Sequence, residues 1–337
     1  MRHLGGNGIR KRGLGIVAAA AALLAVPAAA NASTINFDGT TVHYTAAVSE
    51  TNQLAITASG TDLFFSDAGA AAIIDGDGRG GCSVSGNTAT CTLTSFVTTD
   101  VQLGGRNDTA TASGNLAPLT ALRVDGSAGA DTLAGGNGAD LLLGGTGADH
   151  LDGNQGSDSV FAGTGNDTFQ WDPGDGSDVL EGQENRDTLR FNGANINEQI
   201  QLSANGPRLR MTRDVASVTL DADGIEAVTL ASLGGADTTT VDDLTGTDVT
   251  DFTDDLAAFG GGGDGAADQV IVNGTEGDDA IAISGSTAAG VDATGLASAV
   301  HIRGQEPTDK LVVHTLHGTD SFNDDALEPG TILFSID

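Results

Sequence analysis

Large apolar and aromatic side chains are scarce in this sequence of 337 residues. Aromatic residues make up only 4%, with one Trp and one Tyr, while Gly occurs 50 times. A conventional layered core needs more large side chains, so the chain is either disordered or built around a thin, regular core. Basic residues are also few, since 14 Lys and Arg stand against 46 Asp and Glu. This balance argues against nucleic acid or an anionic membrane as a partner, because both attract basic patches.

The segment 1–32 has the pattern of a secretory signal peptide. A head with four Lys and Arg residues precedes an apolar run at 13–26, Pro27 ends that run, and Ala30-Asn31-Ala32 offers the small-x-small pattern that a signal peptidase cleaves. An uncleaved membrane helix is the alternative, but it requires about 20 apolar residues. We therefore expect a secreted, extracellular protein without a membrane span. Cleavage would move the formal net charge from −32 to −36, because the leader carries four basic residues and no acidic ones.

The two cysteines, Cys82 and Cys91, lie nine positions apart around Ser85-Gly86-Asn87. In an exported protein this spacing is typical of a disulfide that links the strands of a β-hairpin. Zinc is the alternative, but two thiolates without a nearby His leave a tetrahedral site half filled.

From Gly126 the sequence divides into blocks of nine residues. The blocks read GSAGADTLA, GGNGADLLL, GGTGADHLD, GNQGSDSVF and AGTGNDTFQ and, after an insertion at Trp171-Asp172, PGDGSDVLE and GQENRDTLR. Position six is always Asp: Asp131, Asp140, Asp149, Asp158, Asp167, Asp178 and Asp187. Position eight is always large and apolar: Leu133, Leu142, Leu151, Val160, Phe169, Leu180 and Leu189.

This pattern predicts a coil of two blocks. Positions seven to nine alternate outward, inward and outward, as in a three-residue strand, and the six preceding positions form a glycine-rich turn. Each Asp then lies beneath the Asp two blocks later, so the aspartates stack in two columns, which we call ladders. Asp131 would stand at the end of one of them. Such carboxylates repel by about 4 kcal/mol per pair at ~4 Å and an effective dielectric constant near 20.

A hard cation between the carboxylates reverses this repulsion. Ca²⁺ accepts six to eight oxygen ligands in irregular geometry, whereas Mg²⁺ is stricter and retains its waters. The predicted ligands are the seven aspartates and backbone carbonyls of turn glycines: Gly129, Gly136, Gly138, Gly145, Gly147, Gly156 and Gly165. One apolar side chain per block contributes too little to order the whole block, so we expect folding to be coupled to binding.

The blocks resemble the hemolysin-type, or repeats-in-toxin (RTX), nonapeptide G-G-x-G-x-D-x-(large apolar)-x. The stretch from Asp131 to Asp149 follows this motif throughout, while Ser127, Ala162 and the Glu184-Asn185 pair depart from it. The resemblance implies an all-β fold, a right-handed parallel β-roll with Ca²⁺ between successive turns. We assign the roll to residues 126–190.

Both flanks show short alternating runs separated by turn residues, which predict further strands. Residues 33–125 form an N-terminal β-rich region that contains the cysteine hairpin and a damaged repeat, Gly105-Arg106-Asn107-Asp108. The C-terminal flank contains Phe191-Asn192-Gly193, Gly234-Gly235-Ala236-Asp237 and Asp242-Asp243-Leu244. On these segments it resembles the C-terminal part of secreted bacterial RTX-type calcium-binding proteins, and we expect residues 191–337 to form an irregular β-solenoid continuous with the roll. One intact block stands at 274–282, and its Asp279 has no matching block one coil away.

The sequence contains no catalytic signature that we can assign. There is no H-E-x-x-H and no G-x-S-x-G, which removes the RTX metalloprotease and lipase interpretations.

The leading hypothesis is a non-enzymatic calcium-binding protein with a structural role or a role in binding extracellular glycan or cell-surface material. The alternative is a polysaccharide-modifying enzyme of the epimerase or lyase type, although only ten Lys and Arg would remain after cleavage to hold an anionic polymer. A pore-forming toxin would need an amphipathic membrane segment, and none is visible.

Overall fold

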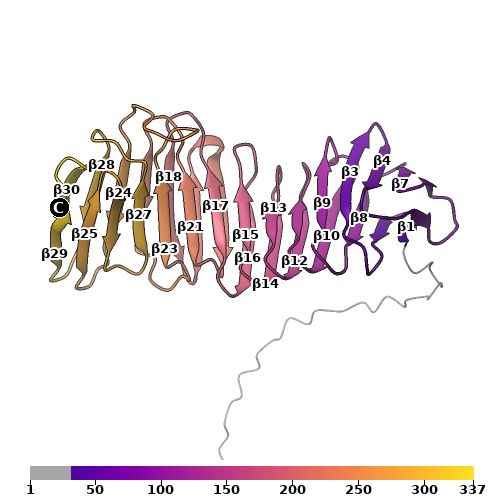
Figure 1. Ribbon diagram of the computed structural model, residues 1–337, viewed down its shortest axis with the longest axis horizontal. Coiled ribbons are helices and arrows are strands. Elements are labelled where there is room, and N and C mark those ends of the chain that lie inside the picture. The colour runs from indigo at the N-terminus through magenta and orange to yellow at the C-terminus, as the bar shows by residue number, and fades with distance from the viewer. Residues whose placement is uncertain (1–31) are drawn as a thin grey trace, which may run out of the picture.

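The computed structural model describes residues 32–337, and this part of the chain is an elongated, all-β solenoid (Figure 1). Two 15-stranded sheets, A and B, face each other across a thin core. The predicted fold class is confirmed. Apart from Ala32, the predicted signal peptide lies outside the described residues. Within residues 32–337 no helix is long and apolar enough to cross a membrane.

The chain alternates between the two sheets, so each coil contributes strands to both. Sheet A contains β1 (Ser33–Phe37), β2 (Thr41–Thr45), β5 (Ile73–Asp75), β8 (Val97–Gln102), β10 (Thr120–Ala128), β12 (Leu141–Thr146), β14 (Ser159–Thr164), β16 (Val179–Glu184), β18 (Gln199–Asn205), β19 (Arg208–Arg213), β20 (Val218–Asp223), β22 (Thr238–Val241), β24 (Gln269–Asn273), β28 (Lys310–His314) and β30 (Leu333–Ile336). Sheet B contains β3 (Gln53–Ser59), β4 (Asp62–Asp67), β6 (Cys82–Ser85), β7 (Thr88–Thr92), β9 (Thr109–Ser113), β11 (Thr132–Ala134), β13 (His150–Asp152), β15 (Thr168–Trp171), β17 (Thr188–Asn192), β21 (Ala227–Ala231), β23 (Asp251–Asp255), β25 (Ala280–Ser286), β26 (Gly290–Thr294), β27 (Ala299–Arg303) and β29 (Ser321–Leu327). A short 3₁₀ turn, η1 (Val215–Ser217), precedes β20.

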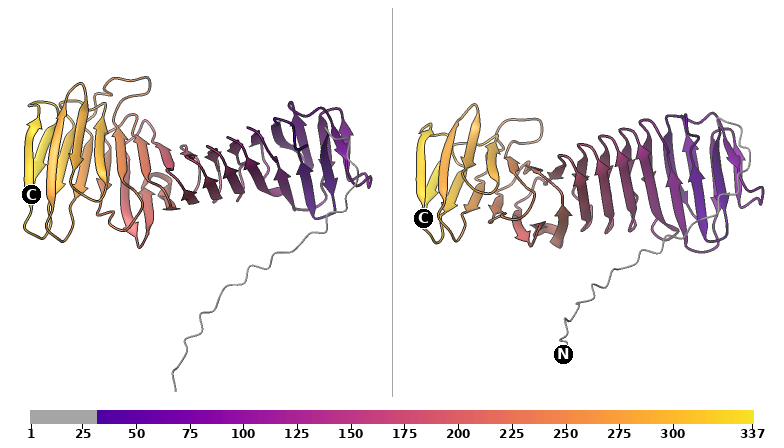
Figure 2. Two further views of the ribbon diagram at one scale, coloured as in Figure 1. Left: turned by 60° about the horizontal axis from the view of Figure 1, so that its bottom comes forward. Right: turned by 90° about the horizontal axis from the view of Figure 1, so that it is seen from below.

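In the repeat segment every strand pairs in parallel with the strand one coil away. Leu133 lies beside Leu151 in sheet B, and Leu142 lies beside Val160 in sheet A, so one coil consists of two blocks, as predicted. These side chains point inward and are at most 1% exposed. The middle of the solenoid, where the strands are short, is thinner than its ends (Figure 2). In sheet B, β11 and β13 have the predicted three residues, whereas β12 and β14 of sheet A have six because the backbone stays extended into the next turn.

The insertion after Gln170 lengthens one coil by two positions without breaking the register, since Val160 still pairs with Leu180 and Phe169 with Leu189. Trp171 extends β15 by one inward position and stacks on Phe191, with the ring centroids 4.0 Å apart. Its indole N–H donates to the carbonyl of Gly176 at 3.0 Å. The tryptophan therefore fills the core at the insertion, as a hydrophobic corner would.

Both flanks continue the same two sheets but insert antiparallel strands. In the C-terminal part, β19 lies between β18 and β20, and β26 lies between β25 and β27. In the N-terminal part β3, β4, β7 and β6 follow one another in antiparallel pairs. Cys82 and Cys91 face each other across β6 and β7 and form a disulfide.

Candidate metal centre

The aspartates at position six lie in two ladders at the edges of the solenoid. The first ladder stands where the chain enters sheet B and contains Asp131, Asp149, Asp167 and Asp187; the second stands where it enters sheet A and contains Asp140, Asp158 and Asp178. Within a ladder the backbone N–H of one aspartate donates to Oδ1 of the aspartate one coil later, for example from Asp131 to Asp149 at 2.8 Å. The equivalent bonds also form across the insertion. Asp158 N–H donates to Oδ1 of Asp178 at 2.9 Å, and Asp167 N–H donates to Oδ1 of Asp187 at 2.8 Å.

The ladders extend into both flanks, which the sequence did not predict. Asp108, in the damaged repeat, donates its N–H to Oδ1 of Asp131 at 2.8 Å, so Asp131 does not end its ladder and that expectation was wrong. At the other end, the N–H of Asp187 donates to Oε2 of Glu226 at 2.6 Å. A third ladder on the sheet A side contains Glu198, Asp237, Asp268 and Asp309.

Asp279 also has a ladder partner, contrary to the sequence-based expectation. Its N–H donates to Oδ1 of Asp320 at 3.0 Å, although the two residues are 41 positions apart. The signal that could have revealed these residues is Asp followed by x and an inward-facing residue, as in Asp268-Gln-Val and Asp309-Lys-Leu. Coil length varies in the flanks, so a fixed period does not find them.

The second oxygen of most ladder aspartates has no hydrogen-bond partner within the described part of the chain. Oδ2 is buried and unpartnered in Asp108, Asp131, Asp149, Asp158, Asp167 and Asp187, and again in Asp237 of the third ladder. The seven aspartates of the blocks are at most 5% exposed. A buried carboxylate oxygen without a donor or a cation is costly. These oxygens therefore indicate where a cation would bind.

Asp140 differs from its neighbours because both of its oxygens are satisfied. Oδ1 accepts from the N–H of Leu122, and Oδ2 accepts from the N–H of Gly136 at 2.7 Å. Gly136 occupies position two of its block with a negative φ, whereas Gly145 and Asn154 at the same position have φ of +109° and +57°. In the blocks of Gly145 and Asn154 a positive φ at position two goes with an unpartnered Oδ2, whereas Gly136, whose φ is negative, donates its N–H to Oδ2 of Asp140.

The glycine at position one makes room for the carboxylate. A Cβ on Gly126 would lie 2.4 Å from Oδ2 of Asp131 and 2.7 Å from the carbonyl oxygen of Gly144, one coil later. A Cβ on Gly144 would lie 2.5 Å from both Oδ2 of Asp149 and the carbonyl oxygen of Ala162. At Gly126 and Gly144 the unpartnered Oδ2 and a carbonyl oxygen of the next coil thus border the same space, which a side chain would fill, and a cation placed there would be attracted by both oxygens.

The predicted glycine ligands occupy the stacked turns. A Cβ on Gly147, Gly156 or Gly165 would overlap the carbonyl oxygen of Gly129, Gly138 or Gly147 respectively, and one on Gly163 would overlap that of Gly145. A Cβ on Gly176 would likewise overlap the carbonyl oxygen of Gly156. These five carbonyls therefore point along the solenoid toward the next coil. The other two glycines differ, since the carbonyl of Gly136 accepts from Gln155 N–H and Gly165 N–H donates to Asn185.

Burial also changes the proton affinity of the ladders. Desolvation, together with the negative charge of the adjacent carboxylates of Asp149 and Asp178, raises the pKa of Asp131 to about 7 and that of Asp158 to about 8. The pKa of Asp187 rises to about 7 for the same reasons. The ladders are therefore places where positive charge, as a proton or a metal ion, is strongly favoured.

Calcium fits this donor set. It consists only of oxygens, carries negative charge, and is irregular in geometry, which Ca²⁺ tolerates. Within residues 32–337 no group of three or more His, Cys, Asp or Glu side chains gathers around one point. Each ion would therefore be held by carboxylates of consecutive coils together with carbonyls of the glycine turns.

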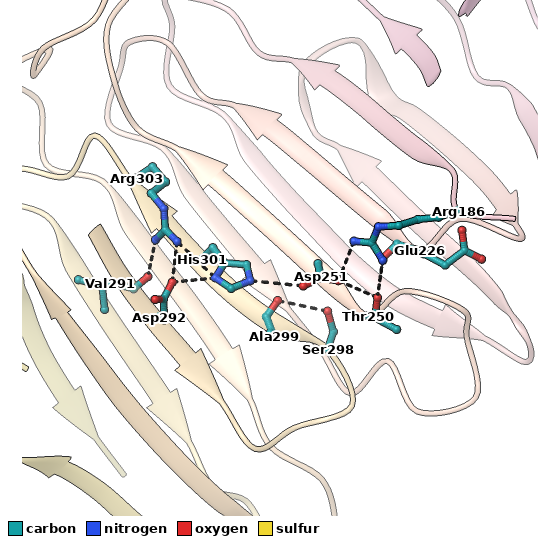
Figure 3. A network of polar contacts seen from close by, with 10 residues as sticks. All are labelled: Arg186, Glu226, Thr250, Asp251, Val291, Asp292, Ser298, Ala299, His301 and Arg303. Carbon is teal, nitrogen blue, oxygen red and sulfur yellow. Dashed lines mark hydrogen bonds and ion pairs between the residues drawn. The ribbon is translucent and has the colours of Figure 1, made fainter. Parts of the chain in front are cut away.

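A separate polar network covers the outer face of sheet B (Figure 3). His301 lies between two carboxylates, with Nδ1 2.7 Å from Asp292 and Nε2 3.5 Å from Asp251. Arg303 pairs with Asp292, and Arg186 pairs with Asp251. The network joins side chains from the turn before β17 and from β23, β26 and β27, and both imidazole nitrogens face acidic groups.

A parallel β-solenoid with carboxylate ladders at its edges belongs to the architectural class of β-rolls. Comparison with protein families identifies the repeats: residues 123–151 and 135–169 match the family model described as RTX calcium-binding nonapeptide repeat (4 copies). The chain therefore contains RTX calcium-binding nonapeptide repeats, as the resemblance implied.

Comparison with curated proteins finds no match. Among solved structures, the chain aligns with the crystal structure of the extracellular lipase LipA from Serratia marcescens at 13% identity. The alignment covers 62% of this chain but only 43% of the lipase, with a TM-score of 0.17. We draw no argument from a TM-score this low.

Proposed function

We propose that this chain is an extracellular calcium-binding protein whose repeat segment is ordered by the ions that fill its ladders. The observation that carries the proposal is the column of buried, unpartnered Oδ2 atoms from Asp131 to Asp187. The family match to calcium-binding repeats over the same residues supports calcium as the ion. The leader-like segment before Ser33 supports export, and millimolar calcium outside cells suits sites assembled from backbone carbonyls.

The proposal predicts that folding of the repeat segment is coupled to calcium. We expect Ca²⁺ in the millimolar range to increase the far-ultraviolet β signal of the mature chain and to shift the emission of the buried Trp171 to shorter wavelength. Mg²⁺ at equal concentration should do much less, because it demands stricter geometry. Circular dichroism and tryptophan fluorescence measure both effects. An unchanged spectrum after EDTA is added to the calcium-loaded protein would contradict the proposal.

We further propose that the role is structural or adhesive rather than catalytic. An open groove of about 510 Å³ on the outer face of sheet A supports binding of glycan or matrix material, because amides and hydroxyls such as Gln199, Gln201, Thr212 and Thr240 line it, together with Arg210 and Arg213. Its lining includes a single carboxylate, Asp214, which accepts from backbone N–H groups of Gln199 and Val215. A glycoside hydrolase usually needs two facing carboxylates.

A further inference from the structure

The core of the C-terminal solenoid contains a carboxylate in a column of otherwise apolar side chains. Along one inward-facing column of sheet B, strand pairing places Trp171 beside Phe191, Phe191 beside Leu230, Leu230 beside Asp254, and Asp254 beside Ile302. Asp254 has no exposed surface. A charged group in such a column is unfavourable unless something compensates it.

The contacts of Asp254 leave one oxygen unsatisfied. Oδ1 accepts from the hydroxyl of Ser232 at 2.7 Å, whereas Oδ2 is buried and has no hydrogen-bond partner among residues 32–337. Ser232 is itself 1% exposed and begins the turn that carries the chain from β21 to β22. The hydroxyl of Thr239, which points inward from β22, also interacts with Asp254.

A second unpartnered carboxylate belongs to the same turn. Asp237 stands five residues after Ser232, as each ladder aspartate stands five residues after the first position of its block, and its Oδ2 is buried without a partner in the described chain. Leu233, at position two, has φ of +69°, the conformation that accompanies an unpartnered Oδ2 in the repeats. Ser232 thus replaces the position-one glycine against which such an oxygen lies.

The charged groups around these two carboxylates are themselves acidic. The carboxylates whose negative charge acts on Asp237 are Glu198, Asp254 and Asp268, and those that act on Asp254 are Asp268 and the outward-facing Asp255. Arg213 is buried nearby but pairs with Glu198 and covers the ring of Trp171.

We propose that Asp237 and Asp254 hold one further calcium ion inside the solenoid, together with the hydroxyl oxygens of Ser232 and Thr239 and carbonyls of the 232–237 turn. Two carboxylates balance the charge of a divalent ion, and the all-oxygen donor set suits Ca²⁺. The site lies outside residues 123–169, so it is separate from the nonapeptide repeats. It rests on the proposed function only in the choice of ion, and the two can fail separately.

The test counts bound calcium in the full mature chain by mass spectrometry of the metal after equilibration in excess Ca²⁺. We expect Asp254→Asn, which keeps the shape of the side chain, and Asp254→Leu, which restores the apolar column, each to lose one ion per chain. In EDTA, Asp254→Leu should melt at the same or a higher temperature than the wild type, because a buried charge has been removed. The control Asp255→Asn changes the adjacent outward-facing carboxylate and should keep the full count.

Asp149→Asn distinguishes this site from the two ladders of the repeat segment, since it should reduce the count while leaving the loss caused by Asp254→Asn intact in the double variant. Empty ladders with a count that still falls by one in Asp254→Asn would refute the proposed function and support the internal site. An unchanged count in Asp254→Asn would overturn the internal site, whatever the ladders bind.

Discussion

At the residue scale, the ladder aspartates have two separable tasks. Oδ1 receives the backbone N–H of the previous coil, so the carboxylate contributes to the fold in the same way as the cap of a helix contributes. Oδ2 has no partner in the described chain at most positions, so it is the atom that requires an ion. Asp140 shows the difference, because Gly136 satisfies its second oxygen.

This difference predicts unequal effects of two matched substitutions. Asp158→Asn keeps an acceptor for Asp140 N–H but removes the charge at an unpartnered oxygen, so the calcium midpoint should rise on the order of tenfold, about 1.4 kcal/mol. Asp140→Asn would place an amide N–H₂ against Gly136 N–H, so it should lower stability by about 1–3 kcal/mol even in saturating calcium. Calcium titration and thermal unfolding measure the two effects. Equal calcium midpoints and equal stabilities in the two variants would contradict the assignment.

The raised pKa values of the ladder aspartates predict opposite pH dependences with and without calcium. The pKa of Asp131 in the fold is about 7 and that of Asp158 about 8, above their unfolded value of 3.8. Between these limits the metal-free fold binds more protons than the unfolded chain, so its stability falls as pH rises from about 4 to about 8. Protons compete with calcium for the same oxygens, so calcium affinity should rise over that range. Calorimetric titrations at pH 5.5 and pH 8 would measure it, and an affinity independent of pH would contradict the ladder assignment.

At the scale of elements, the repeat strands are short and depend on their neighbours, whereas the N-terminal strands carry an additional covalent link. β11 and β13 have three residues each and bury one side chain each, Leu133 and Leu151. By contrast, β6 and β7 form an antiparallel pair joined by the Cys82–Cys91 disulfide. We therefore expect the two regions to respond differently to reduction and to EDTA.

The disulfide should stabilise the N-terminal end without affecting the calcium sites. Closing a loop of this length stabilises by about 2.5 kcal/mol in the chain-entropy description, so Cys82→Ser with Cys91→Ser should lower the unfolding temperature in saturating calcium. The calcium count should stay that of the wild type, because the pair lies outside the ladders. Mass spectrometry of the exported protein should find one peptide linked through Cys82 and Cys91, and two alkylatable thiols in the native protein would refute the link.

At the scale of the whole molecule, the solenoid presents long outer faces covered by polar side chains. The network around His301 connects Arg186 to Arg303 across several coils, and its imidazole faces a carboxylate on each side (Figure 3). Such an arrangement stabilises neighbouring strands against one another. It leaves neither ring nitrogen free to accept a proton from a nucleophile.

We therefore expect binding without turnover. In saturating Ca²⁺ the mature chain should release no reducing sugar or unsaturated product from common polysaccharides, while a glycan array should show binding that disappears with EDTA. Gln201→Ala with Thr240→Ala in the sheet A groove should weaken that binding, and Asp255→Asn on sheet B serves as the control. A turnover number lost on mutating one carboxylate outside the ladders would support the alternative of a polysaccharide-modifying enzyme.

The sequence alone determined the repeat segment, because its pattern is local and periodic. Asp at position six and an apolar residue at position eight recur in every block, and hydrogen bonding between equivalent backbone groups then requires coils of two blocks. The same argument predicted that Asp178 and Asp187 stack with the other aspartates in spite of the two-residue insertion before them. Calcium, as the ion that stacked carboxylates and glycine turns require, followed from the chemistry of the side chains.

Only the tertiary structure decided which residues complete the ladders and where the core itself is charged. Asp237 and Asp268 are 31 positions apart and Asp279 and Asp320 are 41 apart, because coil length varies in the C-terminal flank. Asp254 occupies an inward position that becomes visible only when Leu230 and Ile302 are paired with it. The physical reason is that register in an irregular solenoid depends on contacts between distant segments, which no local period encodes.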